Sequence, residues 1–156
     1  MDVQDGNQVR LTPEGLADLK TELEDLVKTK RPRMVERLSN ARLAGDLSEN
    51  SDYISAKEEL EFLDGRIAEL EHVIKNAFVV KKGHKKTVDL GTKVTLTGNG
   101  SKLVFHIVGE YEADPKEKKI SHESPLGSAL IGKKVGDAVE IMAPVGKVLY
   151  KILSVE

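Results

Sequence analysis

The sequence contains no cysteine and no tryptophan, and aromatic residues make up only 4% of its 156 residues. Without cysteine the chain can form no disulfide and can offer no thiolate to a metal or a substrate, which favours an intracellular protein. No run of apolar residues is long enough to cross a bilayer, and the polar stretch 1–5 has none of the features of a signal peptide. We therefore expect a cytoplasmic protein with no membrane contact.

An excess of charge of one sign is also missing. The 24 Lys and Arg residues against 26 Asp and Glu residues leave a net charge of −2. The molecule as a whole is therefore no general nucleic-acid binder, and any basic surface must be local. The four histidines show no metal-ligand spacing, and no Ser-His-Asp arrangement is visible. Charged residues make up 32% of the chain, which suits a helical rod better than a large globular core.

Two long helical patterns occupy the first half of the chain, on either side of the polar stretch 44–53. Apolar residues recur there at spacings of three and four, which predicts the seam of an antiparallel two-helix coiled coil. The apolar positions are Leu16, Leu19, Leu23, Leu26 or Val27, Met34, Leu38 and Ala41 before the stretch, and Tyr53, Ala56, Leu60, Leu63, Ile67, Leu70 and Ile74 after it. The polar stretch is therefore expected at the tip of a helical hairpin, with the carboxylates of Asp46, Glu49 and Asp52.

The first helix is predicted from Thr12, as N-cap before Pro13, to Leu43. Residues 1–10 are polar and are expected to lack regular structure. Pro32 lies inside the helical pattern, and the apolar register slips across 28–33. We therefore predict one helix bent near Pro32, and two helices broken at 30–32 are the alternative.

The residues of the tip are suited to end one helix and to begin the next. Gly45 is expected to end the first helix in a left-handed conformation. Ser48, or Asp46 one turn earlier, can cap the second helix, which is predicted over 50–76. The charged outer face of that helix is interpreted as solvated surface. Taken by themselves, Asp46 and Glu49 can equally be acids that cap a helix and compensate its dipole.

The composition changes after Asn76, and we place a domain boundary near Ala77. A basic loop follows at 81–86, and beyond it a Gly98-Asn99-Gly100 turn predicts a hairpin. The predicted elements are strands over 92–97, 102–111, 138–143 and 147–155, a charged loop at 114–119, and a short helix from Ser124-Pro125 to Gly132. The predicted fold class is α+β, with an N-terminal antiparallel coiled-coil hairpin over 1–77 and a small C-terminal β-sheet domain with one short helix over 78–156.

The run Gly45-Asp46-Leu47-Ser48-Glu49-Asn50, followed by Tyr53, resembles the tip motif of the Gre family of bacterial transcript cleavage factors, of the GreA type. The resemblance covers nearly the whole chain. Further matching blocks are Arg31-Pro32, Ala41-Arg42, Gly65-Arg66-Ile67, Val108-Gly109, Ala113-Asp114, Ile120-Ser121, Ser124-Pro125-Leu126 and Leu130-Ile131-Gly132.

The resemblance implies a transcription elongation factor that is not itself an enzyme. Members of this family bind bacterial RNA polymerase through a C-terminal domain similar to the FK506-binding proteins, at the mouth of the secondary channel. The coiled coil enters the channel, and the polymerase then cuts its own backtracked transcript near the RNA 3′ end. The expected partners are thus RNA polymerase and nascent RNA, and a monomer fits a rod that enters a channel.

The same resemblance assigns roles to individual residues. Asp46 and Glu49 would help to hold a Mg²⁺ ion shared with the polymerase active centre and would position the attacking water. The residues expected to shape the tip are Gly45, Leu47, Asn50, Asp52 and Tyr53, those expected to contact RNA are Arg42 and Lys57, and those expected to bind the polymerase are Ser124, Pro125 and Leu126. For Tyr53 a place in the apolar seam, and for Arg42 and Lys57 a solvent-exposed charge, remain equal alternatives.

The chemistry of carboxylates agrees with this assignment. Mg²⁺ prefers oxygen ligands and often takes only one or two carboxylates, keeping water for the rest. Two carboxylates cannot complete a tight site, so we expect no tightly bound cofactor and no RNA cleavage without the polymerase. Two other functions remain open: a non-cleaving inhibitor of the same polymerase channel, and a coiled-coil chaperone or adaptor. The intact acidic tip speaks against both.

Overall fold

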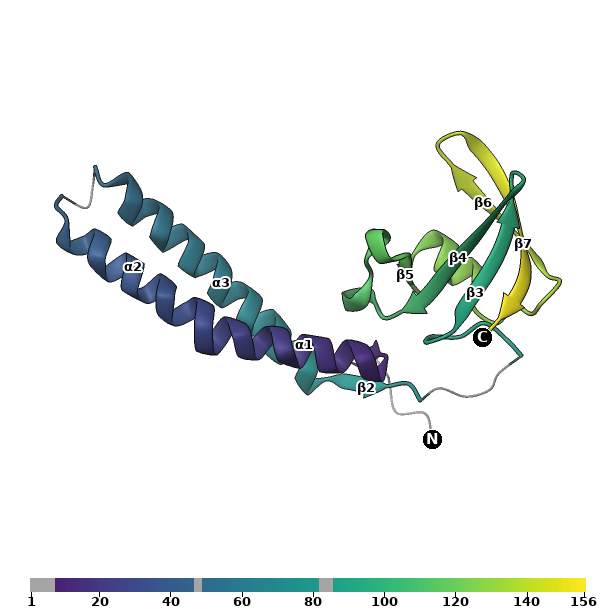
Figure 1. The fold of residues 1–156 in the computed structure, drawn as a ribbon, viewed down its shortest axis with the longest axis horizontal. Helices are drawn as coiled ribbons and strands as arrows, with labels where there is room; N and C mark the ends of the chain where they lie inside the picture. The colour runs from purple at the N-terminus through teal and green to yellow at the C-terminus, as the bar shows by residue number, and fades with distance from the viewer. Residues whose placement is uncertain (1–7, 47–48, 82–85) are drawn as a thin grey trace. The chain divides into compact units, whose positions relative to one another are not determined.

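A computed structural model describes residues 8–46, 49–81 and 86–156 (Figure 1). The chain divides into two compact units, which we call the sheet unit (Met1–Leu16 and Ala77–Glu156) and the hairpin unit (Ala17–Asn76). The α+β class, with a helical hairpin and a sheet carrying one short helix, is confirmed. The predicted division into domains over 1–77 and 78–156 stays a prediction. None of the described helices is long and apolar enough to span a membrane.

Two helical arms run side by side in the hairpin unit (Figure 1). The elements of the first arm are α1 (Pro13–Asp25), the π-helical turn η1 (Leu26–Lys30) and α2 (Arg31–Leu43), and the second arm is α3 (Ser51–Lys75). The predicted seam is buried at Leu19, Leu26 and Ala41 on the first arm and at Ala56 and Leu70 on the second. At the end of α3 the fully buried residue is Val73, whereas the predicted Ile74 is half-buried.

The register slip before Pro32 is a π-helical turn inside one continuous helical run. The N–H of Arg31 donates to the carbonyl of Leu26, five residues back. Proline lacks an N–H group, and its ring would clash with the carbonyl four residues earlier in a regular α-helix. The wider turn ahead of Pro32 accommodates both features and adds one residue to the helical repeat. The prediction of one helix is therefore confirmed, and the alternative of two separate helices is wrong.

Part of the charged surface predicted to be solvated instead bridges the two arms. Arg31 Nε lies 2.7 Å from Asp64 Oδ1, and Arg66 Nε lies 2.9 Å from Glu22 Oε1. These ion pairs are half exposed, so each contributes little to the free energy of unfolding. Arg31 and Asp64 lie at similar separations along the chain from the tip, whereas Glu22 lies further from the tip than Arg66.

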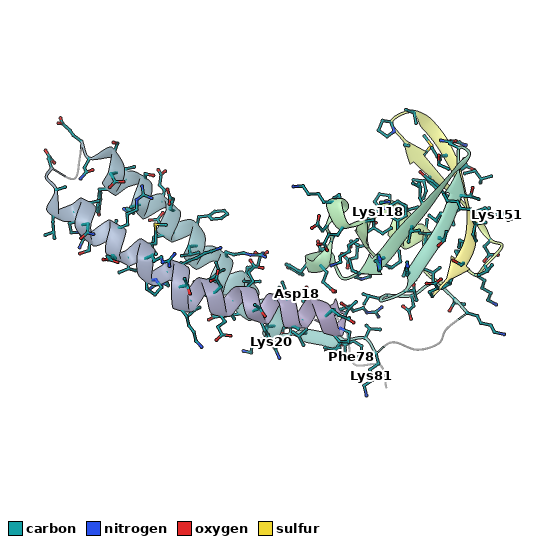
Figure 2. The ribbon with its side chains drawn as sticks, viewed as in Figure 1. Asp18, Lys20, Phe78, Lys81, Lys118 and Lys151 are labelled. Atoms are coloured by element: carbon teal, nitrogen blue, oxygen red, sulfur yellow. The ribbon has the colours of Figure 1, made fainter. Side chains whose placement is uncertain are left out.

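The sheet unit contains two sheets. A short parallel pair, β1 (Val9–Leu11) and β2 (Ala77–Val79), brings Phe78 opposite Arg10. Phe78 is labelled in Figure 2. The five-stranded sheet has the order β5-β4-β3-β7-β6. Its strands are β3 (Lys93–Gly98), β4 (Ser101–Val108), β5 (Lys119–Ser121), β6 (Ala138–Ala143) and β7 (Gly146–Val155).

The predicted hairpin turn is confirmed, since Asn99 and Gly100 both have positive φ, 50° and 77°, between β3 and β4. The helix α4 (Pro125–Leu130) begins as predicted after Ser124. The core beneath it is formed by Val88, Val94, Leu96, Ile107, Leu130, Val139 and Ile152. The sheet fold is thus the one expected from the alternation of apolar residues.

Three predictions fail in this unit. Val9 and Arg10 belong to β1, although residues 1–10 were expected to be irregular. The second long strand ends at Val108, and Glu110–Glu112 forms a 3₁₀ turn (η2) in place of its last residues. The loop predicted at 114–119 contains a second 3₁₀ turn, Pro115–Glu117 (η3), and runs through Lys118, with a φ of 56°, into β5 (Figure 2).

Glu112 holds the start of α1 within the sheet unit. Its carboxylate accepts hydrogen bonds from the N–H of Thr12 at 2.9 Å, from the N–H of Gly109 at 3.0 Å and from the Thr12 hydroxyl. The Thr12 hydroxyl oxygen accepts in turn from the N–H of Gly15 at 3.0 Å, so Thr12 is the predicted N-cap.

Candidate functional site

The hairpin tip lies between the end of α2 and the start of α3. Gly45 follows α2 with a φ of 145°, a backbone conformation that favours glycine, as predicted. The N-cap of α3 is Asn50, whose Oδ1 accepts from the N–H of Tyr53 at 3.1 Å. The predicted caps, Ser48 and Asp46, are therefore wrong. Ser48 and Leu47, which was expected to shape the tip, lie outside the described residues.

Asn50 contacts both arms with one side chain. Its Nδ2 donates to the carbonyl oxygen of Ala41 at 2.7 Å, in the last turn of α2. The same carbonyl accepts from the N–H of Ala44 at 3.2 Å, and the carbonyl of Asn50 accepts from the N–H of Ile54 at 3.1 Å. The amide thus satisfies groups that a helix end leaves unpaired on both sides of the turn. The tip-shaping role of Asn50 in the function of the protein stays a prediction.

The two predicted metal-binding carboxylates lie on this connection. Asp46 and Glu49 are both exposed, and Glu49 accepts no hydrogen bond from any residue that the structure describes. Within the described ranges, no three His, Cys, Asp or Glu side chains come together as a metal site. Carboxylate oxygens suit Mg²⁺, but two of them supply only a part of its coordination shell. The donor set fits an ion whose other ligands come from water and from a second macromolecule.

The third acid of the tip, Asp52, is held by a residue that sequence analysis missed. Arg37 of α2 donates through Nη2 to Asp52 Oδ1 at 2.8 Å and through Nη1 to Glu59 Oε2 at 2.9 Å. Hydrogen bonds to these two carboxylates raise the pKa of Arg37. Arg37 thereby fixes the first two turns of α3 against α2. The signal that could have identified it is the opposite charge of Glu59, which lies at a similar separation from the turn on the other arm.

The predicted RNA-contacting residues lie on opposite arms near the tip. Arg42 is exposed, and its guanidinium carbon lies 5.9 Å from the centroid of the Tyr53 ring. This cation–π geometry orients Arg42 and leaves Tyr53 half-buried between the seam and the tip. Lys57 is exposed on α3. The structure thus places Arg42 beside Tyr53, whereas no described contact joins Lys57 to either residue.

The predicted polymerase-binding residues lie at the start of α4 in the sheet unit. Ser124 Oγ accepts from the N–H of Gly127 at 3.0 Å and donates to the carbonyl of Ser121 at 2.6 Å. Pro125 is exposed at the first helical position, and Leu126 packs against the core. Of the three, Pro125 presents the most surface, and a contact with a partner stays a prediction.

Comparison with known families agrees with this arrangement of hairpin and sheet. Residues 9–79 match the model for the N-terminal part of the transcription elongation factors, and residues 83–156 match the model for the C-terminal part of GreA/GreB. The chain belongs to the GreA/GreB family of transcription elongation factors. The transcription elongation factor GreA of Clostridium acetobutylicum is 47% identical over 150 residues, which cover 94% of this chain and 95% of that protein.

Two further relatives extend the comparison. GreA of Acetivibrio thermocellus is 45% identical over 152 residues, which cover 95% of this chain and 96% of that protein. Among solved structures, the GreA factor homolog 1 of Thermus thermophilus is 28% identical and has a TM-score of 0.46, with 96% of this chain and 99% of that chain covered.

In this GreA/GreB factor, the tip carries two exposed carboxylates on a turn whose ends are held by hydrogen bonds. Asn50 fixes the turn, Arg37 fixes the start of α3, and Arg42 adds a cation beside the aromatic ring of Tyr53. Such a tip can offer oxygen ligands and a positive charge to a partner that contains metal ions and nucleic acid.

Proposed function

We propose that this GreA/GreB factor binds RNA polymerase, inserts its helical hairpin into the secondary channel and stimulates cleavage of backtracked RNA by the polymerase active site. Arrested elongation complexes would then resume synthesis from the new RNA 3′ end. The factor itself is no nuclease in this proposal, because the polymerase supplies the substrate, the remaining ligands and the reacting groups. The proposal is supported by the family, by the length of the hairpin and by the chemistry of its tip.

The observation that carries the proposal is the exposure of Asp46 and Glu49 on a turn braced by Asn50. Hydrogen bonds that hold the ends of a turn reduce the conformational entropy lost when its carboxylates form a shared site. Both carboxylates would be ligands of a Mg²⁺ ion and would orient a water molecule by hydrogen bonding. A Mg²⁺ ion held by these carboxylates would supply one of the two charges that phosphodiester hydrolysis by two metal ions requires.

The remaining residues near the tip suit contacts to RNA that do not depend on sequence. Arg42 is oriented by the ring of Tyr53, and Lys57 is exposed on the other arm. In the proposal these cations contact phosphate groups near the RNA 3′ end, which positions the strand without reading bases. The sheet unit, with Ser124, Pro125 and Leu126 at the start of α4, binds the polymerase outside the channel.

The experiment is a transcript cleavage assay in a halted, backtracked elongation complex with Mg²⁺. The factor is expected to shorten the RNA from its 3′ end, and the shortened RNA is expected to be extended when nucleotides are added. Free RNA incubated with the factor and Mg²⁺ is expected to stay intact. Cleavage of free RNA would contradict the assignment of the chemistry to the polymerase. Binding that blocks transcription without cleavage would replace the proposal with an inhibitory function.

A further inference from the structure

The carboxylate of Glu112 joins the starts of two helical segments inside the sheet unit. Its Oε2 accepts from the N–H of Thr12, ahead of α1, at 2.9 Å and from the N–H of Gly109, ahead of η2, at 3.0 Å. Its Oε1 accepts from the hydroxyl of Thr12. Thr12 is only 6% exposed and Gly109 is buried, so little water competes for these hydrogen bonds. Hydrogen bonds to an ionised acceptor are stronger than neutral ones, so we treat this contact as one feature, the Glu112 joint.

Two glycines make room for the Glu112 joint. Neither Gly15 nor Gly109 has a positive φ, so the backbone conformation does not require glycine at either position. A Cβ atom on Gly15 would overlap the carboxyl group of Glu112, and a Cβ atom on Gly109 would overlap the carbonyl oxygen of Arg10. Gly15 lies inside α1, where glycine is a poor helix former. The chain therefore keeps a residue unsuited to the helix where the close contact needs it, which indicates a specific joint.

The Glu112 joint lies at the base of the helical hairpin. α1 begins in the sheet unit and continues into the hairpin unit as one helix. β1 leads into α1, β2 follows α3, and these two strands pair, so both arms end on the same short sheet. The N–H of Val80 extends this pairing by donating to the carbonyl of Leu11 at 2.9 Å. The joint connects this base to η2, and the chain continues from η2 through β5 to the start of α4.

We propose that Glu112 is a positioning residue for transcript cleavage. By holding the first turn of α1 to η2, it limits the freedom of the hairpin base while the sheet unit is bound to the polymerase. The tip carboxylates Asp46 and Glu49 then reach the active centre in one position. The proposal rests on the proposed function, since it assumes that the sheet unit binds and that the tip acts.

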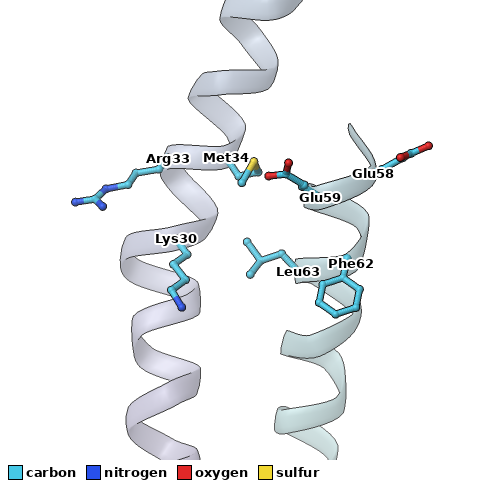
Figure 3. A pocket seen from close by; sticks show the side chains of 7 residues that line it. All are labelled: Lys30, Arg33, Met34, Glu58, Glu59, Phe62 and Leu63. Carbon is cyan, nitrogen blue, oxygen red and sulfur yellow. The ribbon is translucent and has the colours of Figure 1, made fainter. Parts of the chain in front are cut away.

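The length of the hairpin makes its tip sensitive to movement of its base. At 1.5 Å per residue, the first arm from Pro13 to Leu43 spans roughly 45 Å, and a tilt of about 2° at the base would move the tip by roughly 1.5 Å. The two arms would move together, because Met34 and Leu63 point into the space between them (Figure 3). A misplacement of about 1 Å at a reacting centre can cost on the order of a hundredfold in rate.

The first test separates binding from cleavage in a halted, backtracked elongation complex. Glu112→Gln keeps the size of the side chain but leaves one acceptor oxygen for three donors. Its affinity for the complex is expected to stay within about twofold of wild type. Its cleavage rate at saturating factor is expected to fall about tenfold, because the tip is bound but less well placed.

Asp114→Asn is the matched control for Glu112→Gln. Asp114 is also a half-buried carboxylate of the sheet unit, and it caps η3 by accepting from the N–H of Lys116 at 2.9 Å. The control changes a carboxylate to an amide at a turn that does not lead into α1. Both its affinity and its cleavage rate at saturation are expected to match those of wild type.

The second test follows the hairpin base in the free protein. Because the chain has no cysteine of its own, Lys102→Cys on β4 and Glu58→Cys on α3 place two spin labels at exposed positions. Pulsed electron paramagnetic resonance then measures the spread of distances between the labels. The spread is expected to widen when Glu112→Gln is added and to stay unchanged when Asp114→Asn is added. An equal spread with and without Glu112→Gln would overturn the proposal.

Variants of Thr12 keep the test decisive if Glu112→Gln fails to fold. Thr12→Ser keeps the hydroxyl that donates to Glu112, and it is expected to cleave at the wild-type rate. Thr12→Val keeps the shape of the side chain without the hydroxyl, and it is expected to cleave more slowly at saturation. Melting temperatures identify the range in which each variant is folded. Normal cleavage by the serine variant alone assigns the effect to the hydrogen bond with Glu112.

The outcomes separate the inference from the proposed function. If wild type does not stimulate cleavage, the proposed function fails, and the role of Glu112 in cleavage fails with it. If wild type cleaves and Glu112→Gln cleaves equally fast at saturation, only the inference is overturned. A lower melting temperature with an unchanged saturating rate would make Glu112 a purely structural residue. A lower saturating rate at unchanged affinity, with a wider spread of label distances, supports the inference.

Discussion

Asn50 joins the two arms of the hairpin by donating from Nδ2 to the carbonyl oxygen of Ala41 at 2.7 Å. The same side chain caps α3 by accepting from the N–H of Tyr53 at 3.1 Å. One amide therefore fixes both ends of the turn that carries Asp46 and Glu49. An amide can make both contacts, because it carries a donor on Nδ2 and an acceptor on Oδ1.

Replacing Asn50 separates these two contacts. Asn50→Ala removes both and is expected to lower the free energy of unfolding by about 1–2 kcal/mol. Asn50→Asp keeps the acceptor for Tyr53 but cannot donate to Ala41. Hydrogen exchange is expected to show fast exchange of the Tyr53 amide in Asn50→Ala and retained protection in Asn50→Asp. Equal protection in both variants would contradict the capping role.

The contact of Arg37 with Asp52 predicts a local effect on the tip. Arg37→Gln releases Asp52 and is expected to reduce transcript cleavage while binding to the polymerase persists. Its cost in unfolding free energy is expected to stay below about 1 kcal/mol, since exposed ion pairs are weak. Arg31→Gln is the matched control, because the pair Arg31–Asp64 bridges the same arms further from the tip. Equal loss of cleavage in both variants would point to general loosening of the hairpin.

Two helical glycines are expected to respond to alanine in opposite directions. Gly65 of α3 has open space at the position of a Cβ atom, so Gly65→Ala is expected to stabilise the protein by about 0.5–1 kcal/mol. A Cβ atom on Gly15 would overlap the carboxyl group of Glu112, which holds Thr12 and Gly109. Gly15→Ala is therefore expected to destabilise the protein despite its gain in helix propensity. Thermal unfolding of both variants checks the sign.

Acid pH is expected to weaken the ion pair between Glu24 of α1 and Lys28 of η1. The hydrogen bond from Lys28, at 2.5 Å, and its charge lower the pKa of Glu24 below the ordinary value of 4.5. Because the pKa is lower in the folded state, the contribution to stability is present above pH 4.5 and disappears as the pH falls through the folded-state pKa. Lys28→Gln is expected to raise the pKa of Glu24 in an NMR titration. An unchanged pKa would contradict the pairing.

The hairpin could be predicted because its apolar spacing extends over many turns, and the sheet because its strands alternate around clear turns. The strands β1 and β2 could not be predicted, since three residues are too few to show alternation. The two strands also lie far apart in sequence, although they pair with each other. The π-helical turn was visible only as a slip in register before Pro32, which several kinds of break produce.

The residues of the tip motif could be identified from the sequence, but their contacts could not. Ser48, Asp46 and Asn50 are all suitable N-cap residues, and only the backbone of the turn selects Asn50. The pairing of Arg37 with Asp52 depends on which residues of the two arms lie opposite each other. The spacing of apolar residues determines this alignment only to about one helical turn. Helical periodicity therefore predicts where the tip lies, and side-chain geometry determines what braces it.

The most direct test of the account compares transcript cleavage in a halted, backtracked complex by wild type, Asp46→Asn and Glu49→Gln. All three are expected to bind the polymerase with similar affinity, because the substitutions keep the size of the side chains at an exposed turn. Cleavage by the two variants is expected to fall on the order of a hundredfold, as for loss of a group that stabilises the reacting centre. Cleavage at the wild-type rate by both variants would contradict the claim that these carboxylates complete the active site.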